Sequence, residues 1–291
     1  MIPSLPKINK LSFSNSVSKS VNSSEPATLW TPLDLNLGLS TFPQNQPAIW
    51  GWFRADVNTD HLSNGENVEQ WVGYSTSSAF ADAVMTRLDD NTTTPTFETN
   101  IYNGKPAIGF QGNDALEYVA EDDSITEVGE AASQYETYYV IERTNSSNPP
   151  GVEILHRQGG YYEIAFASSN NLYTNNNQWD KVYLNGVEIS SPYSIAQNIT
   201  NNGANILRLT ATSSSNSNFL QSTFLGANNE NGDIGWNGYL AEYLMFARQG
   251  NGFNPRPIGD EQKIEGYLAH KYGIQSKLPS DHPYKSAAPT T

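Results

Sequence analysis

The chain of 291 residues contains no cysteine. Without cysteine the fold can have no disulfide framework, no thiolate metal site and no cysteine nucleophile. Basic residues are also few, with 16 Lys and Arg against 30 Asp and Glu, and the formal net charge is −14. Because binding to duplex DNA usually needs a basic surface, this charge argues against nucleic acid as a partner.

Long hydrophobic runs are also missing. No apolar stretch reaches the roughly 18 residues that a transmembrane helix needs. The first residues, MIPSLPKINKLSFSNSVSKSV, lack the continuous apolar segment of a secretory signal. We therefore expect neither membrane insertion nor Sec-type export.

Residues 1–46 contain scattered proline, serine and asparagine, and their apolar residues follow no sustained period. A segment of this composition cannot bury enough apolar surface to offset the entropy lost on ordering. We interpret it as an extended N-terminal arm that anchors the chain on a neighbouring subunit. The alternative is an arm that folds back on its own domain. Residues 47–291 are then expected to form one domain.

From Ala48 onward, short apolar stretches alternate with turn residues, as in antiparallel β-structure. Strands are expected within Ala48–Asp56, Asn64–Val72, Tyr102–Tyr118, Thr137–Arg143, Val152–Arg157, Tyr161–Ala167, Lys181–Ile189, Asn205–Ala211, Ser222–Ala227 and Tyr239–Ala247. The Asn185-Gly186 pair predicts a tight hairpin. The continuous apolar run at Thr137–Arg143 predicts a strand that is covered on both faces. With no long helix between the strands, the chain is expected to be all-β, with two packed antiparallel sheets.

The end of the chain has a different pattern. Residues 260–273 predict a short amphipathic helix that closes the domain and ends at Gly273, followed by a polar tail. Acidic residues stand near the start of this helix and His270 and Lys271 near its end, where each charge is favourable to the helix dipole.

Three local motifs carry a resemblance to a known family. They are Asn103-Gly-Lys-Pro106, the turn Tyr183-Leu-Asn-Gly186, and a strand YLAEYLMF followed by a helix and the tail Leu278-Pro-Ser-Asp-His-Pro-Tyr284. In this order they resemble concanavalin A-like, laminin G-type domains of phage and bacteria, over residues 48–284. The resemblance implies a jelly-roll sandwich.

The resemblance also implies a function. It is that of a non-enzymatic phage virion structural protein, either a capsid decoration or a tail-appendage subunit. Such a protein would contact other virion proteins through residues 1–46, display a lectin-like domain to cell-surface glycans, and assemble in the host cytoplasm as a homo-oligomer such as a trimer. The alternative is a bacterial carbohydrate-binding module or a jelly-roll glycoside hydrolase.

The sequence gives little support for catalysis. Glycosidases use paired carboxyl groups, and only alternate residues of a strand share a face. None of the expected strands carries a Glu-x-Asp-x-Glu pattern, and the run 121–123 is an acidic turn. The histidines are isolated and lack metal-ligand spacing: His61, His156, His270 and His282. We therefore expect no enzyme activity.

Binding signals are present in two loops rich in asparagine and aromatic residues. Aromatic rings stack on sugar faces and amides bond to hydroxyl groups, so the candidate ligand-binding residues are Tyr173, Asn175, Trp179 and Trp236. Trp179 also occupies a position where laminin G-like domains hold a buried tryptophan, and the core interpretation is the stronger one for it. Asp233 could ligate calcium, but one carboxylate makes no calcium site, so no metal or other cofactor is expected.

Overall fold

The computed structural model describes residues 28–35, 48–76, 83–87, 93–118, 132–144, 153–158, 161–166, 172–173, 179, 181–190, 196–211, 223–226, 235–249 and 258–291. The statements that follow concern these residues. As predicted, the chain is all-β and its strands pair antiparallel.

The larger sheet has nine strands in the order β13-β12-β14-β8-β16-β6-β5-β2, and β1 pairs with β16 beside β6. Its strands are β1 (Ala48–Arg54), β2 (Glu66–Asn67), β5 (Thr96–Tyr102), β6 (Lys105–Gln111), β8 (Ala132–Arg143), β12 (Lys181–Leu184), β13 (Val187–Ile189), β14 (Asn205–Ala211) and β16 (Asn237–Gln249). The long strands β8 and β16 lie in the middle of this sheet and pair along most of their length.

The smaller sheet has seven strands in the order β11-β10-β9-β15-β7-β4-β3. They are β3 (Gln70–Val72), β4 (Val84–Arg87), β7 (Leu116–Tyr118), β9 (Glu153–Gln158), β10 (Tyr161–Phe166), β11 (Leu172–Tyr173) and β15 (Thr223–Leu225). Short helices are α2 (Ala196–Ile199), η1 (Pro32–Asp34) and η4 (Gln275–Lys277), and the one longer helix is α3 (Ile258–Lys271). No helix within the described residues is long and apolar enough to cross a membrane.

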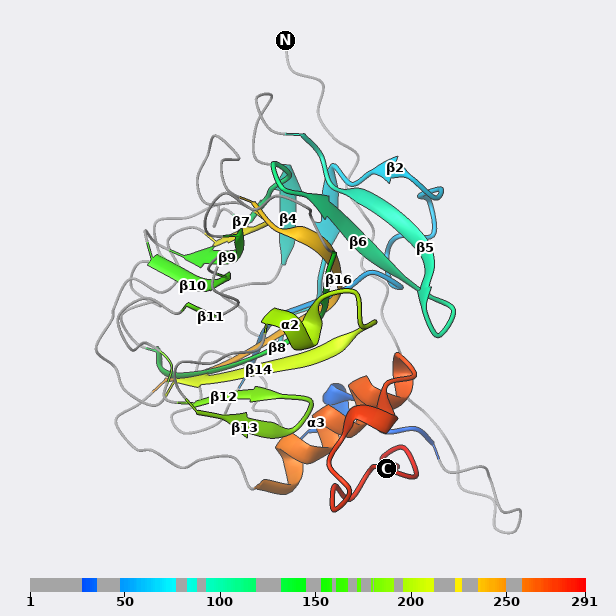
Figure 1. Ribbon diagram of the computed structural model, residues 1–291, viewed down its shortest axis with the longest axis vertical. Helices are drawn as coiled ribbons and strands as arrows, with labels where there is room; N and C mark the ends of the chain where they lie inside the picture. Colours follow the sequence, from blue (N-terminus) through cyan, green and yellow to red (C-terminus); the bar gives the residue numbers. More distant parts are fainter. Residues whose placement is uncertain are drawn as a thin grey trace.

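The nine-stranded sheet is covered on both faces, because its central strands contribute to two separate cores (Figure 1). In β8, Tyr139 and Ile141 pack in the core shared with the seven-stranded sheet. Tyr138 and Val140 belong to a second core, which is completed by α3 and the segment after it. All four side chains are at most 1% exposed. The prediction that this apolar strand is covered on both faces is confirmed.

Helix α3 closes the second core with one face. Its residues Ile264 and Leu268 are fully buried, as is the helix-facing side of β16 at Leu244. The helix ends where Gly273 adopts a positive φ of 70°, a conformation that costs glycine little. The predicted closing helix is therefore present, with its bounds two residues earlier than expected.

Part of the predicted N-terminal arm packs on the chain's own body. The backbone at Leu29 pairs antiparallel with Thr290, and Trp30 N–H donates to Pro289 O at 3.0 Å. The Trp30 ring is 3% exposed and belongs to the second core. Residues 28–35 thus fold back on their own domain. The rest of the arm, residues 1–27 and 36–46, lies outside the described residues, so its anchoring role stays a prediction.

Replacing Trp30 with alanine is expected to lower the free energy of unfolding by about 3 kcal/mol, because a buried aromatic ring leaves a cavity. Leu33→Ala is the matched control, since Leu33 stands three residues away and is 49% exposed. Urea unfolding of the full chain measures both. A Trp30 variant no less stable than the Leu33 variant would show that the ring is not an integral part of the core.

Candidate functional site

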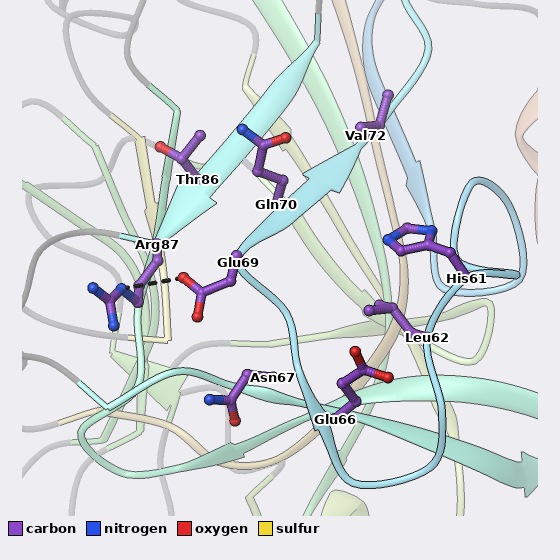
Figure 2. A pocket seen from close by; sticks show the side chains of 9 residues that line it. All are labelled: His61, Leu62, Glu66, Asn67, Glu69, Gln70, Val72, Thr86 and Arg87. Carbon is purple, nitrogen blue, oxygen red and sulfur yellow. Dashed lines mark ion pairs between the residues drawn. The ribbon is translucent and has the colours of Figure 1, made fainter. Parts of the chain in front are cut away.

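A groove of about 600 Å³ lies on the surface around residues 61–72 and 86–87 (Figure 2). Among the described residues, nine side chains line it, of which seven are polar and two are apolar. They are His61, Leu62, Glu66, Asn67, Glu69, Gln70, Val72, Thr86 and Arg87. The volume is typical of a site for a small ligand, but most such sites are mainly apolar. The polar lining suits a ligand that itself carries many hydrogen-bonding groups.

The groove forms where the chain passes from one sheet to the other. Strand β2 is the edge strand of the nine-stranded sheet, and β3, only three residues later, is the edge strand of the seven-stranded sheet. The sequence pattern predicts one strand over Asn64–Val72, whereas the structure has two short strands, β2 and β3. The break at Val68 is what places side chains from both sheet edges around one groove.

Buried residues hold this segment in place. Val68 and Trp71 are fully buried in the core between the sheets, and the Trp71 indole donates to Arg54 O at 3.1 Å. Glu69 and Gln70, which lie between these two residues in the sequence, are exposed. The backbone of the rim therefore rests on well-packed core residues, and an ordered backbone lowers the entropic cost of binding.

A tight turn shapes the opposite wall of the groove. Gly65 has a φ of 76° and donates its N–H to Phe97 O at 2.7 Å. Within the same turn, Ser63 N–H donates to Glu66 Oε2 at 2.8 Å. These contacts fix the turn, and Figure 2 shows His61 and Leu62 lying across the groove from Glu69 and Arg87.

The groove carries charges of both signs. Arg87 Nε lies 3.4 Å from Glu69 Oε2, and the Glu69 side chain is 60% exposed. Glu66 adds a second carboxylate, so the lining has two acidic groups and one guanidinium group. Since the whole chain also carries an excess of negative charge, the electrostatic field disfavours an anionic ligand.

Exposed apolar surface continues from the groove along the outer face of the edge strand. Residues 70 to 74 alternate between the outer face and the core. Trp71 is buried, whereas Val72 is 38% exposed and Tyr74 is 43% exposed. Tyr74 pairs with Trp52 in an isolated β-bridge, which fixes its backbone. This strand therefore presents an aromatic ring on the same outward face as Gln70 and Val72.

None of the four candidates from the sequence is among the described side chains that line this groove. Trp179 and Trp236 are buried in the core between the sheets, with 3% and 0% of their surface exposed, so neither indole face is open to a sugar. Tyr173 lies in β11, the edge strand opposite β3 in the seven-stranded sheet, and its side chain lies outside the description. Asn175 also lies outside the described residues.

The histidines are dispersed through the structure. His61 lines the groove, whereas His156 is buried between the sheets and His270 and His282 belong to the C-terminal segment. Within the described ranges, no three His, Asp or Glu side chains are grouped in a way that could hold a metal ion. Asp233, the residue considered for calcium, falls outside these ranges.

Comparison with known proteins adds no family assignment. No protein-family model matches the chain, and no curated protein matches it significantly.

Proposed function

We propose that this chain is a non-enzymatic binding protein that holds a neutral glycan in the groove formed by residues 61–72 and 86–87. The observation that carries the proposal is the lining itself, which is open, mostly polar and rich in amide and carboxylate groups. Sugar hydroxyl groups both donate and accept hydrogen bonds, and such planar side chains match them well. Val72 and Tyr74 extend the site with surface for the apolar faces of a sugar ring.

Screening of the full chain against an array of neutral and acidic glycans tests this proposal. Binding is expected for neutral oligosaccharides, because the two groove carboxylates repel acidic ones. Gln70→Ala is expected to weaken the binding by about tenfold, since it removes hydrogen bonds worth about 1.4 kcal/mol. Glu188→Gln, on the edge strand β13 at the far end of the larger sheet, serves as the control and should bind normally. Equal affinity of the two variants would refute the assignment.

A glycoside hydrolase is the second candidate, because Glu66 and Glu69 place two carboxyl groups in one groove. Binding is the better supported of the two. Glu69 is largely exposed and already paired with Arg87, whereas a glycosidase acid is usually desolvated so that it stays protonated at neutral pH. Release of reducing sugar from a bound oligosaccharide, abolished by Glu66→Gln, would favour the enzyme.

We also propose that the protein is a structural component of a phage virion. The three motifs resemble laminin G-type domains of virion proteins, and the two layers of antiparallel strands are compatible with their concanavalin A-like jelly roll. In this setting the chain is a capsid decoration or tail-appendage subunit, forms a homo-oligomer such as a trimer, and contacts other virion proteins through its N-terminal arm. The bacterial carbohydrate-binding module is the competing setting.

Deletion of residues 1–27 tests the arm without removing Trp30 from the core. Particles assembled with the shortened chain are expected to lack it, while the soluble chain keeps the circular dichroism spectrum of the full one. Normal incorporation of the shortened chain would show that residues 1–27 do not anchor it.

A further inference from the structure

A buried lysine and two carboxyl groups meet where helix α3 ends against the nine-stranded sheet. Lys271 Nζ donates to Asp56 Oδ1 at 2.8 Å and to Glu242 Oε2 at 2.8 Å. The three side chains are 10%, 16% and 1% exposed. They come from the end of α3, the turn after β1 and the middle of β16, so distant parts of the chain build one cluster.

The sheet is locally irregular so that Glu242 can reach this place. Leu240 and Glu242 would share a face in a regular strand, but the pairing of β16 with β8 shifts register between them. Leu240 consequently packs between the two sheets, whereas Glu242 lies on the side of α3. A carboxylate has thus been moved into an apolar layer, where an ionised group is costly unless it is fully bonded.

Glu242 is held by two further donors. The Trp52 indole donates to Oε1 at 2.5 Å and the Tyr272 hydroxyl donates to Oε2 at 2.8 Å. The rings of Tyr267 and Tyr272 also lie 5.7 and 5.1 Å from Lys271 Nζ. The lysine and its acceptors are therefore fixed in a largely dry, aromatic pocket, which favours a reaction between them over exchange with solvent.

Asp56 has a second cation on its other oxygen. Lys105 Nζ lies 3.3 Å from Oδ2, opposite the oxygen that Lys271 contacts. Burial raises the pKa of Asp56, but Lys271 and Lys105 together bring it below the ordinary value. Asp56 thus starts as a carboxylate, and its conversion into an acyl donor for the amine needs protons delivered to Oδ1 and a positive charge near Oδ2.

We propose that Lys271 and Asp56 condense into an intramolecular amide, with Glu242 as the proton carrier and Lys105 as the group that stabilises the oxyanion. This inference does not depend on glycan binding.

The step balances without any other reactant. One ammonium proton passes along the hydrogen bond to Asp56 Oδ1, and the neutral Nζ attacks the carboxyl carbon. Negative charge develops on Oδ2 beside Lys105. Glu242 carries a second proton from the nitrogen to Oδ1, the bond between carbon and Oδ1 breaks, and that oxygen leaves as water. The third proton stays on the amide nitrogen, and Glu242 ends in the protonation state in which it began.

The product is favoured by the same surroundings. The amide removes the two buried opposite charges of Lys271 and Asp56, whose desolvation penalty their attraction offsets only in part, and Glu242 keeps its hydrogen bonds from Trp52 and Tyr272. The bond also joins residues 215 positions apart in sequence, tying the end of α3 to the sheet. Such a cross-link would keep the closing segment in place under mechanical load.

The intact mass of the purified full chain under denaturing conditions tests the proposal. The wild-type chain is expected to be lighter than its sequence by one water molecule, after allowance for the initial methionine. Trypsin should leave Lys271 uncut and release residues 55–87 and 264–277 as one branched peptide.

Two variants distinguish the amide between Lys271 and Asp56 from other modifications that remove one water molecule. Lys271→Arg keeps the positive charge but forms no such amide, so it should show the full sequence mass. Glu242→Gln keeps the size of the side chain but carries no proton, so its loss of water should be slowed or absent. A wild-type chain at full mass would mean that the three groups form an ion-paired cluster only. A water loss that persists in Lys271→Arg would place the modification elsewhere. Either result overturns the proposal.

Discussion

Replacing Arg143 with alanine is expected to lower the free energy of unfolding by about 3–5 kcal/mol. Arg143 in β8 and Glu153 in β9 form a bidentate pair between the two sheets, with Nε–Oε2 and Nη2–Oε1 distances of 2.7 and 2.9 Å. Their side chains are 9% and 6% exposed. Loss of the guanidinium group leaves a carboxylate in the layer between the sheets without its cation, which is the costly outcome for a buried pair.

Lys181→Ala provides the matched control. Lys181 and Glu188 also pair across neighbouring strands, at 3.2 Å, but both side chains are more than half exposed. Such surface pairs contribute about 0–1 kcal/mol, so the control should unfold almost as the wild type does. The double variant Arg143→Met, Glu153→Leu should recover most of the loss, because no buried charge remains. Equal effects of the two single variants would show that the pair between the sheets is not desolvated.

The second large effect is a loss of stability in acid that depends on His156. This side chain is 1% exposed, its Nδ1 lies 2.5 Å from the Tyr139 hydroxyl, and the Tyr243 ring packs against it. Burial lowers the pKa of His156 from 6.5 to about 3. Between these values the unfolded chain binds a proton that the folded chain does not, so stability falls as the pH falls. The expected slope is about 1.4 kcal/mol per pH unit, and above pH 6.5 this contribution is constant.

Urea unfolding at a series of pH values measures that slope. His156→Gln keeps a hydrogen-bonding side chain beside Tyr139 but does not titrate. The variant should therefore lose the part of the pH slope that is due to histidine and keep the part that is due to the carboxylates. The difference between wild type and variant isolates the contribution of His156. Parallel curves for the two proteins would mean that the imidazole is protonated in the folded state or reaches water.

Most of the strands could be predicted because their side chains alternate or are continuously apolar. The hairpin at Asn185-Gly186 was readable from two residues that both adopt positive φ, 51° and 83°. The covered strand β8 was readable because Tyr138 to Ile141 are all apolar. In each case the local sequence pattern favours the same structure as the burial of the side chains in the folded protein does.

The strands that the sequence did not reveal have broken patterns. In β5, Asn100 has a φ of 60° and the pairing with β6 shifts between Glu98 and Tyr102, so no period of two survives. Strand β4 has only four residues, of which Met85 alone is buried. Short or bulged strands depend on their neighbours for stability, and a single sequence does not show those neighbours.

The groove itself was not predicted, for a related reason. Its residues 66–72 show buried positions at Val68 and Trp71, a spacing of three that does not fit one regular strand. That spacing was the available signal that the chain changes sheets. Aromatic residues in asparagine-rich loops were a weaker guide, because Trp179 and Trp236 fill the core rather than the surface.

Chemical-shift mapping of the labelled full chain with a neutral oligosaccharide tests the central claim most directly. The account predicts that backbone amide shifts concentrate in residues 61–74 and 84–87, and that they weaken in Gln70→Ala. Shifts centred on the opposite edge of the smaller sheet, around Tyr173, or the absence of any shift at millimolar sugar, would contradict it.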